Sequence, residues 1–225
     1  MISKTESYFQ NKKLIHLAQK PEQFYLLLKK VFKMEKYEKL EKAKKEEKKI
    51  ASVVLMNFEK ANKIHLLILK RTGKVRHPNQ FCFPGGSYKK SDENLKNTVL
   101  RELYEETGLY NNFELIGNFT PSLSTSNFLV LPFVGYLHSN DKNKEENANK
   151  YHIFDKNEIE YASEISLEVL LKTESKSRQV FGTEKLWSGT TFGIKYDDLH
   201  LRKNIIWGLS ANFLDSYFSI LRSHL

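Results

Sequence analysis

Residues 101–109, RELYEETGL, concentrate acidic side chains at a spacing that suits metal binding. If residues 92–107 form a helix, Glu102 and Glu106 lie one turn apart on the same face, with Glu105 at the edge of that face. Like charges stacked in this way repel each other and weaken a helix, so a cation that neutralises them is expected. Mg²⁺ and Mn²⁺ prefer oxygen ligands. We therefore predict that Glu102, Glu105 and Glu106 bind one of these ions.

The flanks of this run are typical of a helix that follows a tight turn and packs on a sheet. Apolar side chains recur at helical spacing, Ser91 is a candidate N-cap, and Gly108 suits the left-handed residue at a helix end. Upstream, the sequence Phe-Pro-Gly-Gly at residues 83–86 ends an apolar stretch. A glycine-rich turn can bring the backbone close to a metal or a phosphate, so Gly85 and Gly86 are candidate site residues.

These residues resemble the Nudix box, usually written G-x5-E-x7-R-E-U-x-E-E-x-G-U, where U is aliphatic. The matching positions are Gly86, Glu93, Arg101, Glu102, Leu103, Glu105, Glu106, Gly108 and Leu109. Six residues, one more than in the box, separate Gly86 from Glu93. The alternative is an ordinary amphipathic surface helix rich in glutamate, but the glycines at both ends favour the Nudix interpretation.

The resemblance implies an α/β fold, the Nudix α/β/α sandwich with a mixed sheet. It also implies metal-dependent hydrolysis of a nucleoside diphosphate that is linked to another group. In that chemistry Glu105, Arg101 and Glu106 are the catalytic candidates, with Arg101 orienting a box carboxylate through a charge-assisted hydrogen bond. The general base is either a box glutamate or an acid of a later loop. Glu158 and Glu160 lie in a suitable place, although surface charge is the simpler interpretation of each.

Residues 66–86, LLILKRTGKVRHPNQFCFPGG, resemble the segment that marks the coenzyme A diphosphatases of the Nudix family, roughly LLTxRSxxLRxHxGxVxFPGG. This branch implies hydrolysis of coenzyme A and acyl-coenzyme A to 3′,5′-ADP and (acyl-)4′-phosphopantetheine. Coenzyme A carries a 3′-phosphate besides its diphosphate, and arginine can bind phosphate with two donors. Arg71 and Arg76, with Lys74, are therefore the candidate substrate ligands. The chain differs from the branch just before the box, where residues 79–80, Asn-Gln, stand in place of a glycine.

Two alternatives remain open for the function. A Nudix enzyme with another substrate, such as ADP-ribose, NADH or a capped RNA end, has the same box. A non-catalytic Nudix domain that serves as a binding module is expected to lose box carboxylates, and none is lost here. NADH and ADP-ribose lack the 3′-phosphate, so the basic segment is the feature that distinguishes coenzyme A from them.

Length and composition fit a single domain with an extension. The chain has 225 residues, of which 40% are hydrophobic and 28% charged. We expect residues 1–50 to form an N-terminal helical extension and residues 51–225 to form the Nudix hydrolase domain. No apolar run reaches the ~20 residues that span a bilayer, and the N-terminal residues lack an apolar signal segment. Cys82, the only cysteine, lies in an apolar run and is expected to be a buried structural thiol.

The formal net charge of +9 favours anionic partners such as a nucleotide, a nucleic acid or a membrane surface. Glutamates interleaved with the lysines of residues 34–49 argue against a nucleic-acid arm, so a small-molecule substrate is the expected partner. Ser223-His224-Leu225 resemble the Ser-Lys-Leu type of peroxisomal signal. We therefore expect binding to the peroxisomal import receptor and a peroxisomal location, with the cytoplasm as the alternative.

The elements that must position the box helix can also be predicted. Two strand-like runs, residues 51–58 and 64–70, are predicted to form a hairpin, and residues 128–137 are predicted to form a later strand. Pro132 lies inside that later strand, which predicts a sheet edge or a bulge there. Residues 204–221 are predicted to form a closing amphipathic helix.

Overall fold

The computed structural model describes residues 4–46, 48–75, 77–109, 111–138, 156–181, 186–193 and 205–225. Its centre is the hairpin of β1 (Ile50–Lys60) and β2 (Lys63–Arg71), which are joined by Ala61 and Asn62. Both turn residues have a positive φ, 51° and 58°, as the type I′ turn of a two-residue hairpin requires. The hairpin predicted from the sequence is confirmed.

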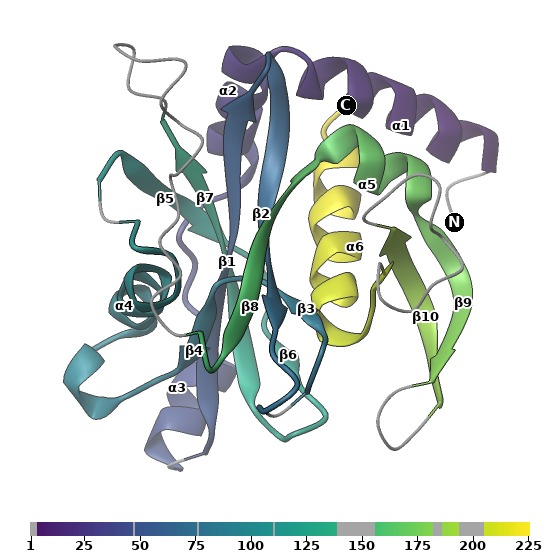
Figure 1. The fold of residues 1–225 in the computed structure, drawn as a ribbon. Coiled ribbons are helices and arrows are strands. Elements are labelled where there is room, and N and C mark those ends of the chain that lie inside the picture. The colour runs from purple at the N-terminus through teal and green to yellow at the C-terminus, as the bar shows by residue number, and fades with distance from the viewer. Residues whose placement is uncertain are drawn as a thin grey trace.

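The hairpin belongs to a larger mixed sheet whose main path runs β3-β2-β1-β7-β5 (Figure 1). β7 (Leu129–Leu137) is parallel to β1, whereas the pairs of β1 with β2 and of β7 with β5 are antiparallel. The other strands of this sheet are β3 (Phe81–Cys82), β4 (Gly85–Ser87), β5 (Phe113–Asn118), β6 (Ser122–Leu123) and β8 (Ile159–Ser166). A smaller sheet contains β9 (Ser175–Phe181), β10 (Leu186–Gly193) and β11 (Ile205–Ile206).

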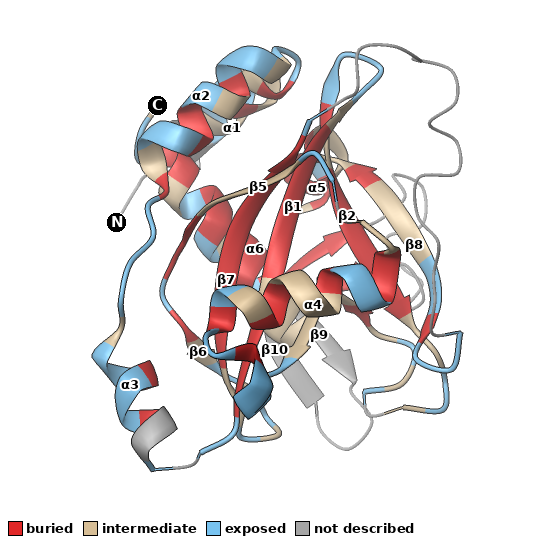
Figure 2. Ribbon diagram, turned by 90° about the vertical axis from the view of Figure 1, so that its left-hand side faces the viewer, coloured by how far each residue is buried: buried red, intermediate tan, exposed pale blue. Residues whose placement is uncertain are grey.

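Helices cover both faces of the larger sheet (Figures 1 and 2). α3 (Glu38–Lys45) and α4 (Leu95–Thr107) pack on one face, and α1 (Lys4–Ala18), α2 (Pro21–Val31), α5 (Leu167–Thr173) and α6 (Gly208–Arg222) pack on the other. Alternate residues of β1 separate the two cores, because Val54 and Met56 join the core beneath α4 and Leu55 joins the core beneath α6. The α/β sandwich with a mixed sheet is therefore confirmed.

Within the described ranges, no helix combines the length and the apolar character that a membrane crossing needs.

Pro132 lies in β7, which is a central strand and not the predicted sheet edge; the bulge, the other prediction, is not at Pro132, and the irregularity of β7 with β5 lies opposite Val134 and Gly135. Pro132 is paired with Val53 of β1 on one side. On the other side β5 ends at Asn118, β6 begins at Ser122, and the Phe119 N–H donates to the Pro132 carbonyl. The proline therefore faces the gap between two short strands, where the ladder is interrupted and an N–H is not required.

The N-terminal extension shares its core with the sheet. Leu14 of α1 and Phe24 of α2 are fully buried, in the same cluster as Leu55 of β1 and Tyr217 of α6. Phe32 stacks on Tyr217, with 5.5 Å between the ring centroids. The helices predicted for this extension are present and complete the core on that face of the sheet.

The shared core predicts a large effect of truncating one side chain of the extension. Phe24→Ala should lower the free energy of unfolding by about 3–5 kcal/mol, because it empties a fully buried position. Leu26→Ala is the matched control on the same helix, since Leu26 is 64% exposed, and should change that free energy by less than about 0.5 kcal/mol. Chemical denaturation of the two variants is the measurement. If Phe24→Ala and Leu26→Ala have the same denaturation midpoint, α2 does not unfold together with the sheet.

Candidate active site

α4 begins later than the sequence predicts. Its N-cap is Asn94, whose side chain accepts a hydrogen bond from the Asn97 N–H, and not Ser91. Lys90–Asp92 form a short 3₁₀ turn instead, and Glu93 follows with a positive φ of 62°, which prevents that turn from continuing into the helix. The helix ends at Thr107, as predicted, and Gly108 follows in the left-handed conformation.

Asp92 anchors Arg101. The Asp92 carboxylate accepts two hydrogen bonds from the Arg101 guanidinium, from Nε at 2.8 Å and from Nη2 at 3.0 Å. It also accepts one from the Lys89 N–H at 2.9 Å and one from the Thr98 hydroxyl at 3.0 Å. The Asp92 side chain is 4% exposed, and the Arg101 guanidinium holds its pKa well below the ordinary value. Glu93, which the box pattern assigned to this place, is exposed. The box position matched to Glu93 in the sequence is therefore filled by Asp92 in the structure, where Asp92 forms an ion pair with Arg101.

A signal for Asp92 is present in the sequence. Five residues separate Asp92 from Gly86, which is the spacing of the box. The additional residue lies between Asp92 and Arg101, where the 3₁₀ turn and Glu93 accommodate it.

Arg101 connects the loop after Gly86 to the carboxylates of the helix. Its Nη1 donates to Glu102 Oε1 at 2.8 Å and to Glu105 Oε2 at 2.9 Å, and its Nη2 donates to the Ser87 carbonyl at 3.1 Å. The Glu105 side chain is 48% exposed, whereas that of Glu102 is 16% exposed. Arg101 is thus placed to orient two carboxylates, one at the surface and one toward the interior.

Glu102 and Glu106 both lie against the glycine turn that precedes the helix. Glu106 is 6% exposed, and its Oε2 accepts a hydrogen bond from the Gly85 N–H at 2.8 Å. Burial raises the pKa of Glu106 to about 8; the Gly85 hydrogen bond opposes this rise, and the charge of Glu102 adds to it. Burial also raises the pKa of Glu102, against the opposing effect of Arg101. A nearby cation would favour the charged form of both carboxylates.

Gly85 and Gly86 allow this close approach. Gly85 has a φ of 145°, and a Cβ there would lie 2.2 Å from the Ser52 carbonyl oxygen. A Cβ on Gly86 would lie 2.6 Å from Glu102 Oε1. The two glycines predicted as site residues therefore lie directly against the two carboxylates of the helix.

The donors around this turn fit a divalent cation in their chemistry. Glu102 and Glu106 supply carboxylate oxygens, and the missing Cβ of Gly86 leaves room beside Glu102. In the described part of the chain, no three His, Cys, Asp or Glu side chains are already arranged as a complete metal site. Arg101 forms ion pairs with both Glu102 and Glu105. A bound cation would share two of the three predicted ligands with this guanidinium.

Gly86→Ala should weaken metal binding without unfolding the chain. The added Cβ would displace the Glu102 carboxylate, which is the end of a flexible side chain and moves more easily than backbone. We expect the affinity for Mn²⁺ to fall about 10–100-fold, with a change in melting temperature below about 3 °C. Gly73→Ala is the control, since the nearest atoms would lie 3.8 Å from its Cβ. Unchanged affinity in Gly86→Ala would show that this glycine is not needed beside the carboxylate.

A second wall of the site comes from β2 and β3. Burial raises the pKa of the Cys82 thiol to about 12, the charge of Glu106 adds to this rise, and Arg71 opposes it. Cys82 of β3 pairs with Leu69 of β2, two residues before Arg71. Lys74 is exposed in the loop after β2, and Arg76 lies outside the described residues.

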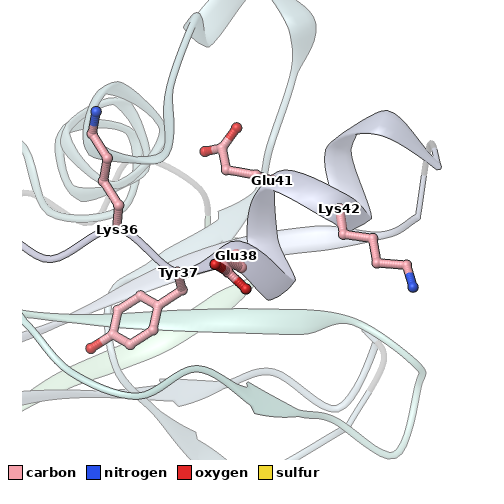
Figure 3. A pocket seen from close by; sticks show the side chains of 5 residues that line it. All are labelled: Lys36, Tyr37, Glu38, Glu41 and Lys42. Atoms are coloured by element: carbon pink, nitrogen blue, oxygen red, sulfur yellow. The ribbon is translucent and has the colours of Figure 1, made fainter.

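A separate hollow on the surface is lined by Lys36, Tyr37, Glu38, Glu41 and Lys42 (Figure 3). These residues come from the start of α3 and from the segment just before it. None of the predicted site residues lines this hollow. The candidate site is therefore the α4 carboxylates together with the glycine turn.

Comparison with known families identifies the part of the chain that contains the box. Residues 47–181 of the 225 match the NUDIX domain family. The chain belongs to the Nudix family, as the sequence predicts. A MutT/nudix family protein from Enterococcus faecalis has a similar structure, with a TM-score of 0.46 and 16% identity, covering 100% of this chain and 74% of that chain.

Two relatives share part of the sequence. Peroxisomal coenzyme A diphosphatase NUDT7 of Mus musculus is 34% identical over 91 residues, which are 40% of this chain and 39% of that protein. Peroxisomal coenzyme A diphosphatase ndx-8 of Caenorhabditis elegans is 32% identical over 89 residues, which are 38% of this chain and 38% of that protein. The match thus covers less than half of either relative.

Proposed function

We propose that this chain is a Nudix hydrolase that cleaves the diphosphate bond of coenzyme A and acyl-coenzyme A, giving 3′,5′-ADP and (acyl-)4′-phosphopantetheine. The observation that carries the hydrolase part is the placement of Glu102 and Glu106 on α4, against the turn of Gly85 and Gly86. The coenzyme A part is supported by the names of the two relatives and by the basic segment after β2.

We assign Glu102, Glu105 and Glu106 as ligands of Mg²⁺ or Mn²⁺. Such an ion, when bound, neutralises diphosphate oxygens and lowers the pKa of a water molecule. The chain holds these ligands in place, because the Gly85 N–H donates to Glu106 and Arg101 donates to Glu102 and Glu105. In the reaction a water oxygen bonds to one phosphorus and gives one of its protons to the general base, which is a box glutamate or an acid of a later loop. The bridging P–O bond breaks, and the bridging oxygen leaves with the electron pair.

The basic segment is proposed to bind phosphate groups through charge-assisted hydrogen bonds. Lys74 is exposed in this segment, and the charge of Arg71, at the end of β2, opposes the rise of the Glu106 pKa that burial causes. Arg76 is proposed from its sequence position alone. The glycines at residues 85–86 bring the backbone close to the place of the diphosphate.

We also propose a peroxisomal location, with the cytoplasm as the alternative. Both relatives are named as peroxisomal proteins, and Ser223-His224-Leu225 resemble the Ser-Lys-Leu type of signal. Ser223 and His224 are exposed, whereas Leu225 packs half-buried against the core and its carbonyl accepts a hydrogen bond from Lys13. The location is tested by fusing a fluorescent protein to the N-terminus of the chain and imaging the fusion in cells. A fusion protein that stays in the cytoplasm would contradict the proposed peroxisomal location.

Product analysis with a panel of substrates tests the proposed function. The panel contains coenzyme A, acetyl-coenzyme A, dephospho-coenzyme A, ADP-ribose and NADH, each with Mg²⁺ and with Mn²⁺. We expect 3′,5′-ADP and 4′-phosphopantetheine from coenzyme A, and a lower kcat/KM for dephospho-coenzyme A. If NADH or ADP-ribose is hydrolysed as fast as coenzyme A or faster, the chain is still a Nudix hydrolase but coenzyme A is not its substrate. If no substrate of the panel is hydrolysed, both the hydrolase activity and the coenzyme A assignment are wrong.

A further inference from the structure

The C-terminal tripeptide, residues 223–225, continues α6 as a hydrogen-bonded turn. Each of its backbone N–H groups donates to a carbonyl of the helix, at 3.1 Å from residue 223 and at 3.2 Å from residues 224 and 225. The Ser223 hydroxyl donates to the Ile220 carbonyl at 2.8 Å, and His224 Nδ1 lies 2.9 Å from the same carbonyl oxygen. Chain ends fray unless they are tied down. This chain end is tied to the helix through its backbone and through two side chains.

The N-terminal extension also holds the C-terminal tripeptide. Figure 1 shows the C-terminus beside α1. Lys13 of α1 donates from Nζ to the Leu225 carbonyl at 3.3 Å. The Leu225 side chain is half-buried and packs against the core to which α1 and α6 both contribute. The last residue is therefore held at its backbone by α1 and at its side chain by the core.

Arg222, the residue before the C-terminal tripeptide, is an anchor inside the protein. It is 5% exposed, and its Nε donates to Asn11 Oδ1 of α1 at 2.7 Å. The guanidinium also forms an ion pair with Glu174, which follows α5. Separating the partners of a buried ion pair is costly. We therefore expect that α6 can unwind as far as Arg222 and no further while the protein stays folded.

This anchor limits the reach of the C-terminal tripeptide. Three fully extended residues span at most about 10–11 Å. A receptor that captures a chain end through its carboxylate and side chains needs those groups uncovered. In the turn, the N–H groups are bonded to the helix and the Leu225 side chain is packed on the core. A receptor can therefore bind these groups only after the turn has opened.

Building on the proposed peroxisomal location, we propose that α1 and the Arg222 anchor keep the C-terminal tripeptide closed, folded as the last turn of α6, and that the import receptor binds only molecules in which this turn has opened. The apparent affinity for the receptor is then reduced by the fraction of molecules that are open. The N-terminal extension thus controls access to the signal, in addition to completing the core of the sheet.

Carboxypeptidase digestion measures the opening without the receptor, because the protease needs an extended chain end. The wild type is compared with Lys13→Ala and with a chain that continues after Leu225 through a flexible glycine-serine linker to a second Ser-His-Leu. We expect the wild type to release leucine about 10-fold or more slowly than the linker-extended chain, and Lys13→Ala to release it two- to threefold faster than the wild type, about the effect of one hydrogen bond. Lys12→Ala is the matched control, because the Lys12 ammonium lies over the Tyr8 ring, and should match the wild type.

Calorimetric titration of the peptide-binding domain of the import receptor tests the binding itself. A free peptide of residues 217–225 and the linker-extended chain should bind with dissociation constants within about twofold of each other. The full-length wild type should bind about 10-fold or more weakly. Lys13→Ala should bind about two- to threefold more tightly than the wild type, with the same melting temperature, because Lys13 is exposed.

Both measurements can overturn the proposal. Equal digestion rates, or equal receptor affinities, of the wild type and the linker-extended chain would show that the tripeptide is already open in the folded protein. Wild-type behaviour of Lys13→Ala in both measurements would show that α1 does not hold the tripeptide. If neither the free peptide nor the linker-extended chain binds the receptor, the receptor and the peroxisomal location are both wrong, and the digestion rates still show whether the turn is closed.

Discussion

Glu106→Gln is expected to lower the rate of coenzyme A hydrolysis to about a thousandth of the wild type or less, with the fold intact. Glutamine has nearly the same shape but cannot carry the charge that a metal ligand supplies. Glu106 is 6% exposed and bonded to the Gly85 N–H, so no other carboxylate can easily take its place. The measurement is kcat with Mg²⁺, together with circular dichroism. Glu93→Gln, an exposed acid of the preceding turn, should retain wild-type activity.

The outcome separates the roles assigned to this residue. Wild-type activity in Glu106→Gln would remove Glu106 both as a metal ligand and as a catalytic residue. Loss of activity together with a loss of structure would instead show that the carboxylate stabilises the fold.

The same substitution should change how stability depends on pH. Burial raises the pKa of Glu106 from its ordinary 4.5 to about 8, so folding favours the protonated form. Its contribution to stability is complete below pH 4.5 and is lost as pH rises through about 8. At pH 9 without divalent ions, Glu106→Gln should melt about 4–8 °C above the wild type. Added Mg²⁺ should close this gap, and a melting temperature of the wild type that is the same at pH 5 and pH 9 would argue against the buried carboxylate.

Asp92→Asn should have the second largest effect, on both stability and rate. It removes the charge that partners Arg101, which also holds Glu102 and Glu105. Because the Asp92 side chain is 4% exposed, we expect the free energy of unfolding to fall by about 3 kcal/mol. The rate of hydrolysis should fall about 10–100-fold, as for other residues that orient metal ligands. Chemical denaturation and kcat/KM measure the two effects.

Glu93→Gln decides between the two acids of the turn. It should change the free energy of unfolding by less than about 0.5 kcal/mol, since Glu93 is exposed.

The stabilising effect of Asp92 should depend on pH. The pKa of Asp92 lies below its ordinary 3.8, so the contribution of Asp92 to the free energy of unfolding is present above that pH and is lost as pH falls. The difference in stability between Asp92→Asn and the wild type should therefore narrow in acid. Equal effects of the two substitutions would restore Glu93 as the box glutamate.

Local spacing was sufficient to predict the helix and its carboxylate face. Glu102 and Glu106 are one turn apart in any α-helix, and Gly108 ends the helix where its sequence position suggests. The hairpin of β1 and β2 was likewise predictable, because two alternating apolar runs flank a short polar connection. These features depend on neighbours within a few residues of each other.

The features that could not be predicted depend on distant parts of the chain. One additional residue before Arg101 can be accommodated at several places, and only the folded turn shows that Asp92 keeps the ionic contact. The environment of Arg71 depends on which face of β2 the helix covers and on the pairing with β8. Pro132 is tolerated in a central strand because two short strands leave a gap beside it.

Mn²⁺ binding measured by electron paramagnetic resonance tests most directly the central claim that the carboxylates of α4 hold a divalent ion at the glycine turn. We expect the wild type to bind Mn²⁺ saturably and Glu93→Gln to bind it equally well. Glu102→Gln and Glu106→Gln should each lose about 10-fold or more in affinity. Equal Mn²⁺ binding by the wild type and Glu106→Gln would contradict the claim.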